Sequence, residues 1–286
     1  MKTSGELAAG LAGLQQRTSD GVRETVGMLE SMGQVLFFHH AAPEGERRRT
    51  GLVLCPSFFE VAMLQSAEAA LTRAAAKAGF PAIYVQPAGV GDSAGDSFTC
   101  TVEDRVKAAT AGFADLLERF PDLEAPCFFG PRIGGAVATL AAQRHHLPAS
   151  VVLWDPSFDP DKYWRQVRRL ARVASVVGRQ KRSDDPKAQL EDNGATLVLG
   201  IPVSNMQLDD VRSVRERIDH GRIDGPAFVV SPSDSALNDA RGVIAQVASG
   251  PVEGKSLGFL DIWRLGLRQG EVAVPPTIEW MESNLR

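Results

Sequence analysis

Hydrophobic residues from about position 34 onward fall into short apolar runs separated by longer stretches of helical periodicity. Apolar runs of four to eight residues are typical of buried strands, whereas apolar positions three and four apart are typical of amphipathic helices. The runs predict strands at residues 34–40, 51–55, 81–86, 125–129, 150–154 and 226–231. Helices are predicted at 62–78 and 102–120. This alternation predicts an α/β fold, with a mostly parallel central sheet and helices on both faces.

The first two predicted strands differ from the others in their connection. A polar segment at 41–50 joins residues 34–40 to residues 51–55 and is too short for a crossover helix. We therefore expect these two strands to form an antiparallel hairpin at one edge, and the remaining strands to be parallel.

The N-terminal residues do not follow this alternation of strand and helix patterns. Apolar residues recur there at spacings that suit a helix, namely Leu7, Leu11, Leu14, Val22, Val26 and Leu29. The pattern predicts a helical extension over 1–32, ahead of a main domain at 33–286. Such a helix could dock on its own domain or on a partner, including a second copy of the chain.

A charged segment at 156–225 forms a second exception and is predicted to be a helical cap insertion. Within it, an apolar stripe begins at Tyr163, and basic residues follow another face of the same predicted helix: Lys162, Arg165, Arg169 and Arg172. This basic face has two interpretations: it is solvated, or it belongs to a lid that attracts anions.

Composition narrows the functional classes. The chain has 286 residues, of which 44% are hydrophobic and 23% charged, and its net charge is -4. It lacks the basic excess that favours nucleic-acid binding, and no uncharged run reaches the roughly 20 residues of a membrane span. Its three cysteines, Cys55, Cys100 and Cys127, have neither disulfide-framework nor metal-ligand spacing. With no signal-peptide pattern, we expect a cytoplasmic protein without a metal or cofactor.

The most informative segment is FFGPRIGG at 128–135, a predicted strand-to-helix turn. Its spacing matches the G-x-S-x-G nucleophile elbow, but Arg132 stands where that pattern has serine. Arginine stays protonated and cannot attack a carbonyl, so this residue favours holding an anion over ester hydrolysis. The helix beginning near Gly134 would add its free N–H groups. Two alternatives remain open: Arg132 contacts a ligand, or it pairs with a buried carboxylate and fills the site.

Three carboxylates are candidates for an ion pair or for acid-base chemistry beside Arg132. Asp155 follows the strand at 150–154, and Asp234 follows the strand at 226–231. Glu60 could pair with Arg132, act as a base through water, or cap the helix that begins near residue 61. The preceding loop should also supply an oxyanion-site N–H and pocket-lining side chains, for which the candidates are Ser57, Phe58 and Phe59.

Four segments together resemble the α/β-hydrolase superfamily over roughly residues 33–286. They are LCPSFFE at 54–60, GVGDSAGD at 89–96, the elbow at 130–135 and LWDP at 153–156. The chain is most similar to hydrolase-like proteins associated with exosortase and exopolysaccharide gene clusters. Those proteins resemble this chain in carrying arginine at the elbow, in a Gly-Leu-Arg-x-Gly pattern, although Pro131 replaces the leucine here.

The resemblance implies that Asp155 and Asp234 occupy positions used for the acid of a catalytic triad. It also implies a histidine after the last strand, yet all five histidines precede Asp234. The segment 258–263 instead resembles the aromatic pattern of the exosortase-associated proteins, which makes Trp263 a ligand-binding candidate together with Ile133 of the elbow.

Two functional hypotheses follow. The first is a pseudoenzyme that binds an anionic or acyl small molecule under the cap, with Arg132 contacting the ligand. The second is a hydrolase or acyltransferase acting on esters or thioesters. It would use water activated by Glu60, Asp155 or Asp234, and Arg132 would stabilise the oxyanion.

Overall fold

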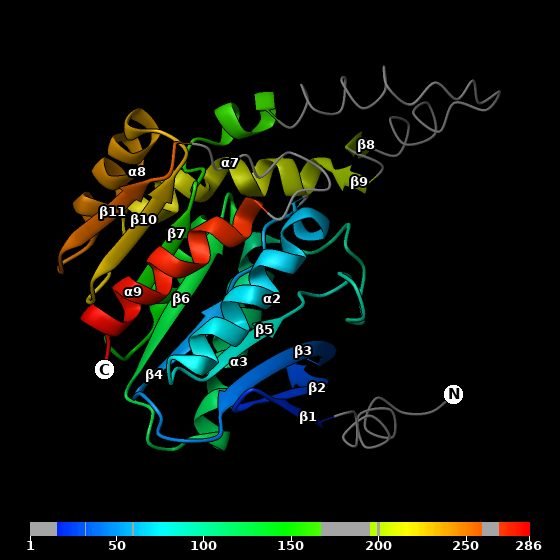
Figure 1. Ribbon diagram of the computed structural model, residues 1–286. Coiled ribbons are helices and arrows are strands. Elements are labelled where there is room, and N and C mark those ends of the chain that lie inside the picture. The colour runs from blue at the N-terminus through cyan, green and yellow to red at the C-terminus, as the bar shows by residue number, and fades with distance from the viewer. Residues whose placement is uncertain (1–15, 32, 59, 167–194, 199–200, 259–268) are drawn as a thin grey trace, which may run out of the picture.

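The computed structural model describes residues 16–31, 33–58, 60–166, 195–198, 201–258 and 269–286. Nine strands in these ranges form one sheet in the order β1-β2-β3-β5-β4-β6-β7-β10-β11 (Figure 1). The strands are β1 (Gln16–Ser19), β2 (Val22–Ser31), β3 (Gln34–Pro43), β4 (Thr50–Leu54), β5 (Ala82–Val85), β6 (Ala125–Pro131), β7 (Ser150–Trp154), β10 (Ala227–Ser231) and β11 (Val252–Ser256). A separate hairpin pairs β8 (Ala195–Val198) with β9 (Ile201–Ser204).

The six predicted strands are all present, and β5, β6, β7 and β10 belong to a parallel set as expected. The same parallel set contains β4, which was expected in a hairpin, and β11, which was not predicted. The predicted edge hairpin is wrong. β5 lies between β3 and β4, so β3 pairs with β5 and β2 rather than with β4. A polar connection between two apolar runs shows that the chain turns, but it does not show which strands become neighbours.

Helices cover both faces of this sheet (Figure 1). The helices α2 (Val61–Lys77) and α9 (Val274–Asn284), the latter preceded by the 3-10 turn η1 (Gln269–Ala273), pack on one face. The other face carries α3 (Val102–Arg119), α4 (Gly134–Arg144), α7 (Asn205–Asp219) and α8 (Asp234–Val247). Each face therefore has its own apolar core, with the buried strands between them.

The predicted N-terminal helical extension is wrong over its described residues. Residues 16–31 form the antiparallel strands β1 and β2, joined by Asp20 at φ +54° and Gly21 at φ +74°. An Asp-Gly pair with both φ values positive is the favoured two-residue hairpin turn, because its twist matches that of the flanking strands. Val22, Val26 and Leu29 thus belong to a strand. Leu7, Leu11 and Leu14 lie outside the described residues.

The region predicted as a cap also differs from expectation in its described parts. Residues 160–166 are helical, with Tyr163 buried as predicted, whereas Arg169 and Arg172 lie outside the described residues. α7 buries its apolar stripe of Val211, Val214 and Ile218 in the same core as α3 and α4. It therefore covers the sheet rather than capping its end.

Two expectations from composition can be compared with the structure. Cys55, Cys100 and Cys127 are all buried free thiols. In the described ranges, no helix has the length and apolarity needed to cross a membrane.

Candidate functional site

The turn between β6 and α4 requires glycine at two positions. A Cβ atom on Gly130 would lie 2.1 Å from the backbone oxygen of Gly134, and one on Gly134 would lie 2.4 Å from the backbone oxygen of Cys55. Between them Arg132 has φ +51°, in the left-handed region that side chains other than glycine rarely occupy. This tight, strained turn displays the Arg132 side chain at the carboxyl end of the sheet.

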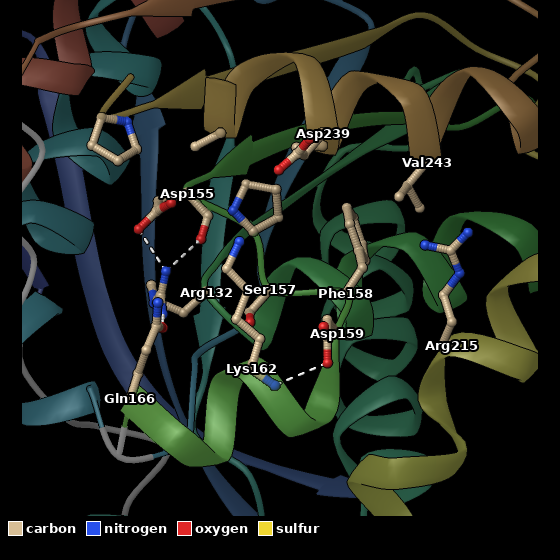
Figure 2. Close-up of a pocket in the computed structure, with 14 residues that line it drawn as sticks. Arg132, Asp155, Ser157, Phe158, Asp159, Lys162, Gln166, Arg215, Asp239 and Val243 are labelled. Carbon is tan, nitrogen blue, oxygen red and sulfur yellow. Dashed lines mark hydrogen bonds and ion pairs between the residues drawn. The ribbon is translucent and has the colours of Figure 1, made fainter. Parts of the chain in front are cut away.

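The Arg132 guanidinium is held by an ion pair (Figure 2). Its Nη1 donates to Asp155 Oδ2 at 2.5 Å and to the Asp155 backbone oxygen at 3.1 Å. Its Nη2 donates to the side-chain oxygen of Gln166, from the helical segment 160–166. Asp155 directly follows β7 and itself has φ +43°. Since Arg132 is 3% exposed, this pairing compensates a charge that is almost fully buried.

Glu60 is a second carboxylate close to the guanidinium. Its Oε1 lies 3.7 Å from Arg132 Nε, while its Oε2 accepts hydrogen bonds from Ser57 Oγ at 2.6 Å and Tyr163 OH at 3.0 Å. Glu60 precedes α2 but makes no side-chain capping bond, so the capping interpretation is wrong. Its carboxylate instead joins a buried network that links the loop after β4 to the helix at 160–166.

Burial controls the protonation of the groups around Arg132. It raises the pKa of the Asp155 carboxyl above its usual value, although the charge and hydrogen bonds of Arg132 oppose the rise. Burial, together with the nearby Glu60 carboxylate, also raises the pKa of the Tyr163 hydroxyl, which therefore stays protonated and donates.

A cavity of about 480 Å³ adjoins Arg132 at the carboxyl end of the strands. This edge of an open α/β sheet is where ligands usually bind. Its wall is formed by Arg132, Asp155, Pro156, Ser157, Phe158, Asp159, Lys162, Gln166, Arg215, Pro232, Ala236, Asp239, Ala240 and Val243. Figure 2 shows Lys162 and Gln166 on one side and Asp239 and Val243, from α8, on the other. The site thus combines a buried ion pair with adjoining space, so both alternatives for Arg132 retain a structural basis.

Comparison with known proteins identifies the architecture. No protein-family model matches the chain, and no curated protein sequence matches it significantly. A hypothetical protein from Pseudomonas aeruginosa superposes with a TM-score of 0.60 at 13% identity, covering 96% of this chain and 100% of its own. The α/β-hydrolase domain-containing protein 10 from mouse gives 0.52 at 10% identity, covering 91% and 99%. The chain has the α/β-hydrolase fold.

A further solved structure with this fold is Est1E from Butyrivibrio proteoclasticus, with ferulic acid bound. It gives a TM-score of 0.55 at 12% identity, covering 90% of this chain and 98% of its own. Identities this low show the α/β-hydrolase fold alone. They leave the resemblance to exosortase-associated proteins as a prediction.

In the α/β-hydrolase fold, a tight strand-to-helix turn with small residues at this spacing is the nucleophile elbow. The turn that displays Arg132 has this spacing, with Gly130 and Gly134 on either side. Asp234 has a different environment from Asp155. It is exposed in the first turn of α8, where its charge suits the helix N-terminus, and it is absent from the cavity wall.

The residues predicted to line a ligand pocket are placed differently. Ser57 and Ile133 are 0% exposed, Phe58 is 8% exposed, and none of the three belongs to the wall of the cavity beside Arg132. They pack beneath the elbow, because the loop after β4 lies directly against Gly134. Phe59 and Trp263 lie outside the described residues.

Sequence reasoning missed two side chains of this site. Gln166 reaches Arg132 from a segment whose pattern indicated only a helix. Arg105 of α3 lies over the Phe58 ring, 3.7 Å from its centre, and donates to the Ser57 backbone oxygen at 3.3 Å. Arg105 could have been suspected, since it stands three residues after Val102 and four before Ala109, on the apolar side of an amphipathic helix.

Proposed function

We propose that this protein binds an anionic or acyl small molecule in the cavity beside Arg132 and does not operate a Ser-His-Asp triad. One observation carries the proposal. The elbow, which in this fold presents the nucleophile, presents a guanidinium at the wall of a cavity of about 480 Å³. Membership of the exosortase-associated group and a cytoplasmic location remain part of the proposal.

The contacts of Arg132 support a place for an anion. Nη2 donates to Gln166, a neutral acceptor on the cavity wall. A ligand carboxylate or phosphate oxygen in that place would form a stronger, charge-assisted hydrogen bond. Lys162 is exposed on the same wall and forms no ion pair within the described part of the chain. Its ammonium would add to the attraction.

The contacts around Arg132 support the hydrolytic alternative less well than they support anion binding. No histidine follows Asp234 in the sequence. Asp155 is engaged by Arg132, and Glu60 is 0% exposed with Ser57 and Tyr163 bound to it, so neither carboxylate is poised to activate a water beside a substrate. Loss of the nucleophile and the histidine removes most of the rate of a triad enzyme.

Titration calorimetry with hexanoate tests the binding proposal. We expect hexanoate to bind the wild type and the neutral hexanamide to bind at least about tenfold more weakly, because only the anion gains charge-assisted bonds. Lys162→Gln should weaken hexanoate binding about three- to tenfold, and Gln166→Glu should weaken it further by placing a carboxylate before Arg132. Lys107→Gln, the same charge loss at an exposed position of α3, is the control.

Two outcomes would contradict the proposal. Equal affinity of the wild type, Lys162→Gln and Gln166→Glu for hexanoate would place the anion elsewhere. Release of thiol from the N-acetylcysteamine thioester of hexanoate, if lost in Gln166→Glu and retained in Lys107→Gln, would establish the hydrolytic alternative instead.

A further inference from the structure

A second cavity, of about 320 Å³, lies between α2 and the strands β2, β3 and β5. One face of α2 forms its floor through residues spaced as i, i+3, i+4, i+7 and i+8: Gln65, Glu68, Ala69, Thr72 and Arg73. The remaining wall consists of Glu24, Val26, Phe37, His39, Tyr84 and Gln86. It shares no residue with the wall of the cavity beside Arg132.

Glu68 is the unusual member of this wall. It is 2% exposed, and neither of its carboxyl oxygens has a hydrogen-bond partner among the described residues. A buried polar group without a partner costs about 1–3 kcal/mol, and native structures contain few such groups. An unsatisfied carboxyl on a cavity wall is explained most simply by a donor that occupies the cavity.

The other charged groups of the wall satisfy one another. Arg73 Nε lies 3.0 Å from both carboxylate oxygens of Glu24, and His39 Nε2 lies 2.9 Å from one of them. Burial opposes ionisation of Glu24, but Arg73 and His39 together lower its pKa. Burial lowers the pKa of His39, so its ring is mostly neutral near pH 7. Among the described residues of this wall, each cation is therefore paired with Glu24, and the net charge of the cavity depends on Glu68.

We propose that this cavity binds a small primary ammonium ligand with an apolar body, whose ammonium donates to the Glu68 carboxylate. Tyr84 and Gln86, as hydroxyl and amide, offer further polar contacts beside Glu68, while Val26, Phe37 and Ala69 provide surface for the hydrocarbon part. An aromatic ring on the ligand can pack against Phe37.

Binding of an ammonium beside Glu68 should be accompanied by release of a proton, which can be measured. Burial, together with the nearby Glu60 carboxylate, raises the pKa of Glu68 to about 8, so the empty site is protonated at pH 7. The other titratable groups near Glu68 are Cys55 and Tyr84, whose pKa values burial also raises and which stay neutral. An arriving ammonium keeps its own protons, and Glu68 releases its proton to solvent as the ion pair forms.

Phenethylamine, 2-phenylethanol and phenylacetate form a matched cation, neutral and anion series for the test. Calorimetry at pH 7 should show phenethylamine binding at least about tenfold more tightly than the other two. Titrations in buffers of different ionisation enthalpy should show about one proton released per ligand bound. Glu68→Gln should weaken phenethylamine binding by about tenfold or more and abolish the proton release.

Two further variants complete the design. Ala69→Phe should block the cavity without altering a charge, and Glu118→Gln, the same carboxyl-to-amide change at an exposed position of α3, should bind phenethylamine like the wild type. The proposal is overturned if phenethylamine fails to bind the wild type at about 10 mM. It is equally overturned if 2-phenylethanol binds as tightly, or if Glu68→Gln and Ala69→Phe leave the affinity unchanged.

Discussion

Replacing Gly130 with alanine is expected to lower the free energy of unfolding by at least about 4 kcal/mol, near the upper limit for single substitutions. The added Cβ would lie 2.1 Å from the Gly134 backbone oxygen and 2.6 Å from the Gly135 backbone nitrogen. Both are main-chain atoms at the start of α4, so no rotamer change relieves the overlap. Urea unfolding followed by tryptophan fluorescence would measure the loss, and insoluble protein would be its extreme form.

Gly242→Ala is the matched control for this substitution. Gly242 is exposed within α8, and a Cβ there meets no atom within 4 Å. Alanine should stabilise the helix by about 0.5–1 kcal/mol, because it has the higher helix propensity. If Gly130→Ala were as stable as the wild type, the elbow would be able to relax, and the strained display of Arg132 would be a wrong description.

Much of the fold could be predicted from local sequence patterns. The turn at Gly130 was recognisable because a tight strand-to-helix turn needs small residues at fixed spacing, and the structure shows the backbone atoms that impose this need. The parallel strands were recognisable because strands buried on both faces are apolar throughout. The order of neighbouring strands could not be predicted in the same way. β5 lies between β3 and β4, and this pairing depends on residues far apart in the sequence.

The N-terminal error has a local cause. Val22, Val26 and Leu29 fit helical spacing, but the pair Asp20-Gly21 just before them is a strong hairpin signal, and the structure has a hairpin there. Where periodicity is ambiguous over a short stretch, turn chemistry is the better guide.

The site was only partly predictable for a different reason. Arg132, Asp155 and Glu60 follow strands or adjoin motifs, so their convergence at one sheet edge follows from the topology. Gln166 comes from a segment whose position over the elbow depends on tertiary packing. The cavity depends on the same packing, so its wall could not be predicted residue by residue.

The sequence around Glu68 carries a local signal of a buried acid. Leu64, Leu71 and Ala75 mark the buried stripe of α2, and Glu68 falls on that stripe, four residues after Leu64 and three before Leu71. A carboxyl among apolar positions at helical spacing indicates a buried acid, which either finds a partner or stays protonated.

Glu68→Gln is expected to stabilise the protein by an amount that grows with pH. The folded-state pKa of Glu68 is raised from 4.5 to about 8, so the folded protein holds a proton that the unfolded chain releases between these values. The wild type therefore keeps the full contribution of the protonated carboxyl below about pH 4.5 and loses it as the pH rises to 8. The amide that replaces this carboxyl in the variant does not titrate.

The difference in unfolding free energy between the variant and the wild type should be within about 1 kcal/mol at pH 5. It should grow by up to about 1.4 kcal/mol per pH unit and level off at several kcal/mol above about pH 8. Urea unfolding at pH 5, 7 and 9 gives the three points needed, and Glu118→Gln should follow the wild type throughout because its carboxyl is exposed. Parallel pH curves for Glu68→Gln and the wild type would show that Glu68 is ionised and partnered in the folded protein. Because no amine ligand is needed, this measurement establishes the state of the empty cavity independently of what the cavity binds.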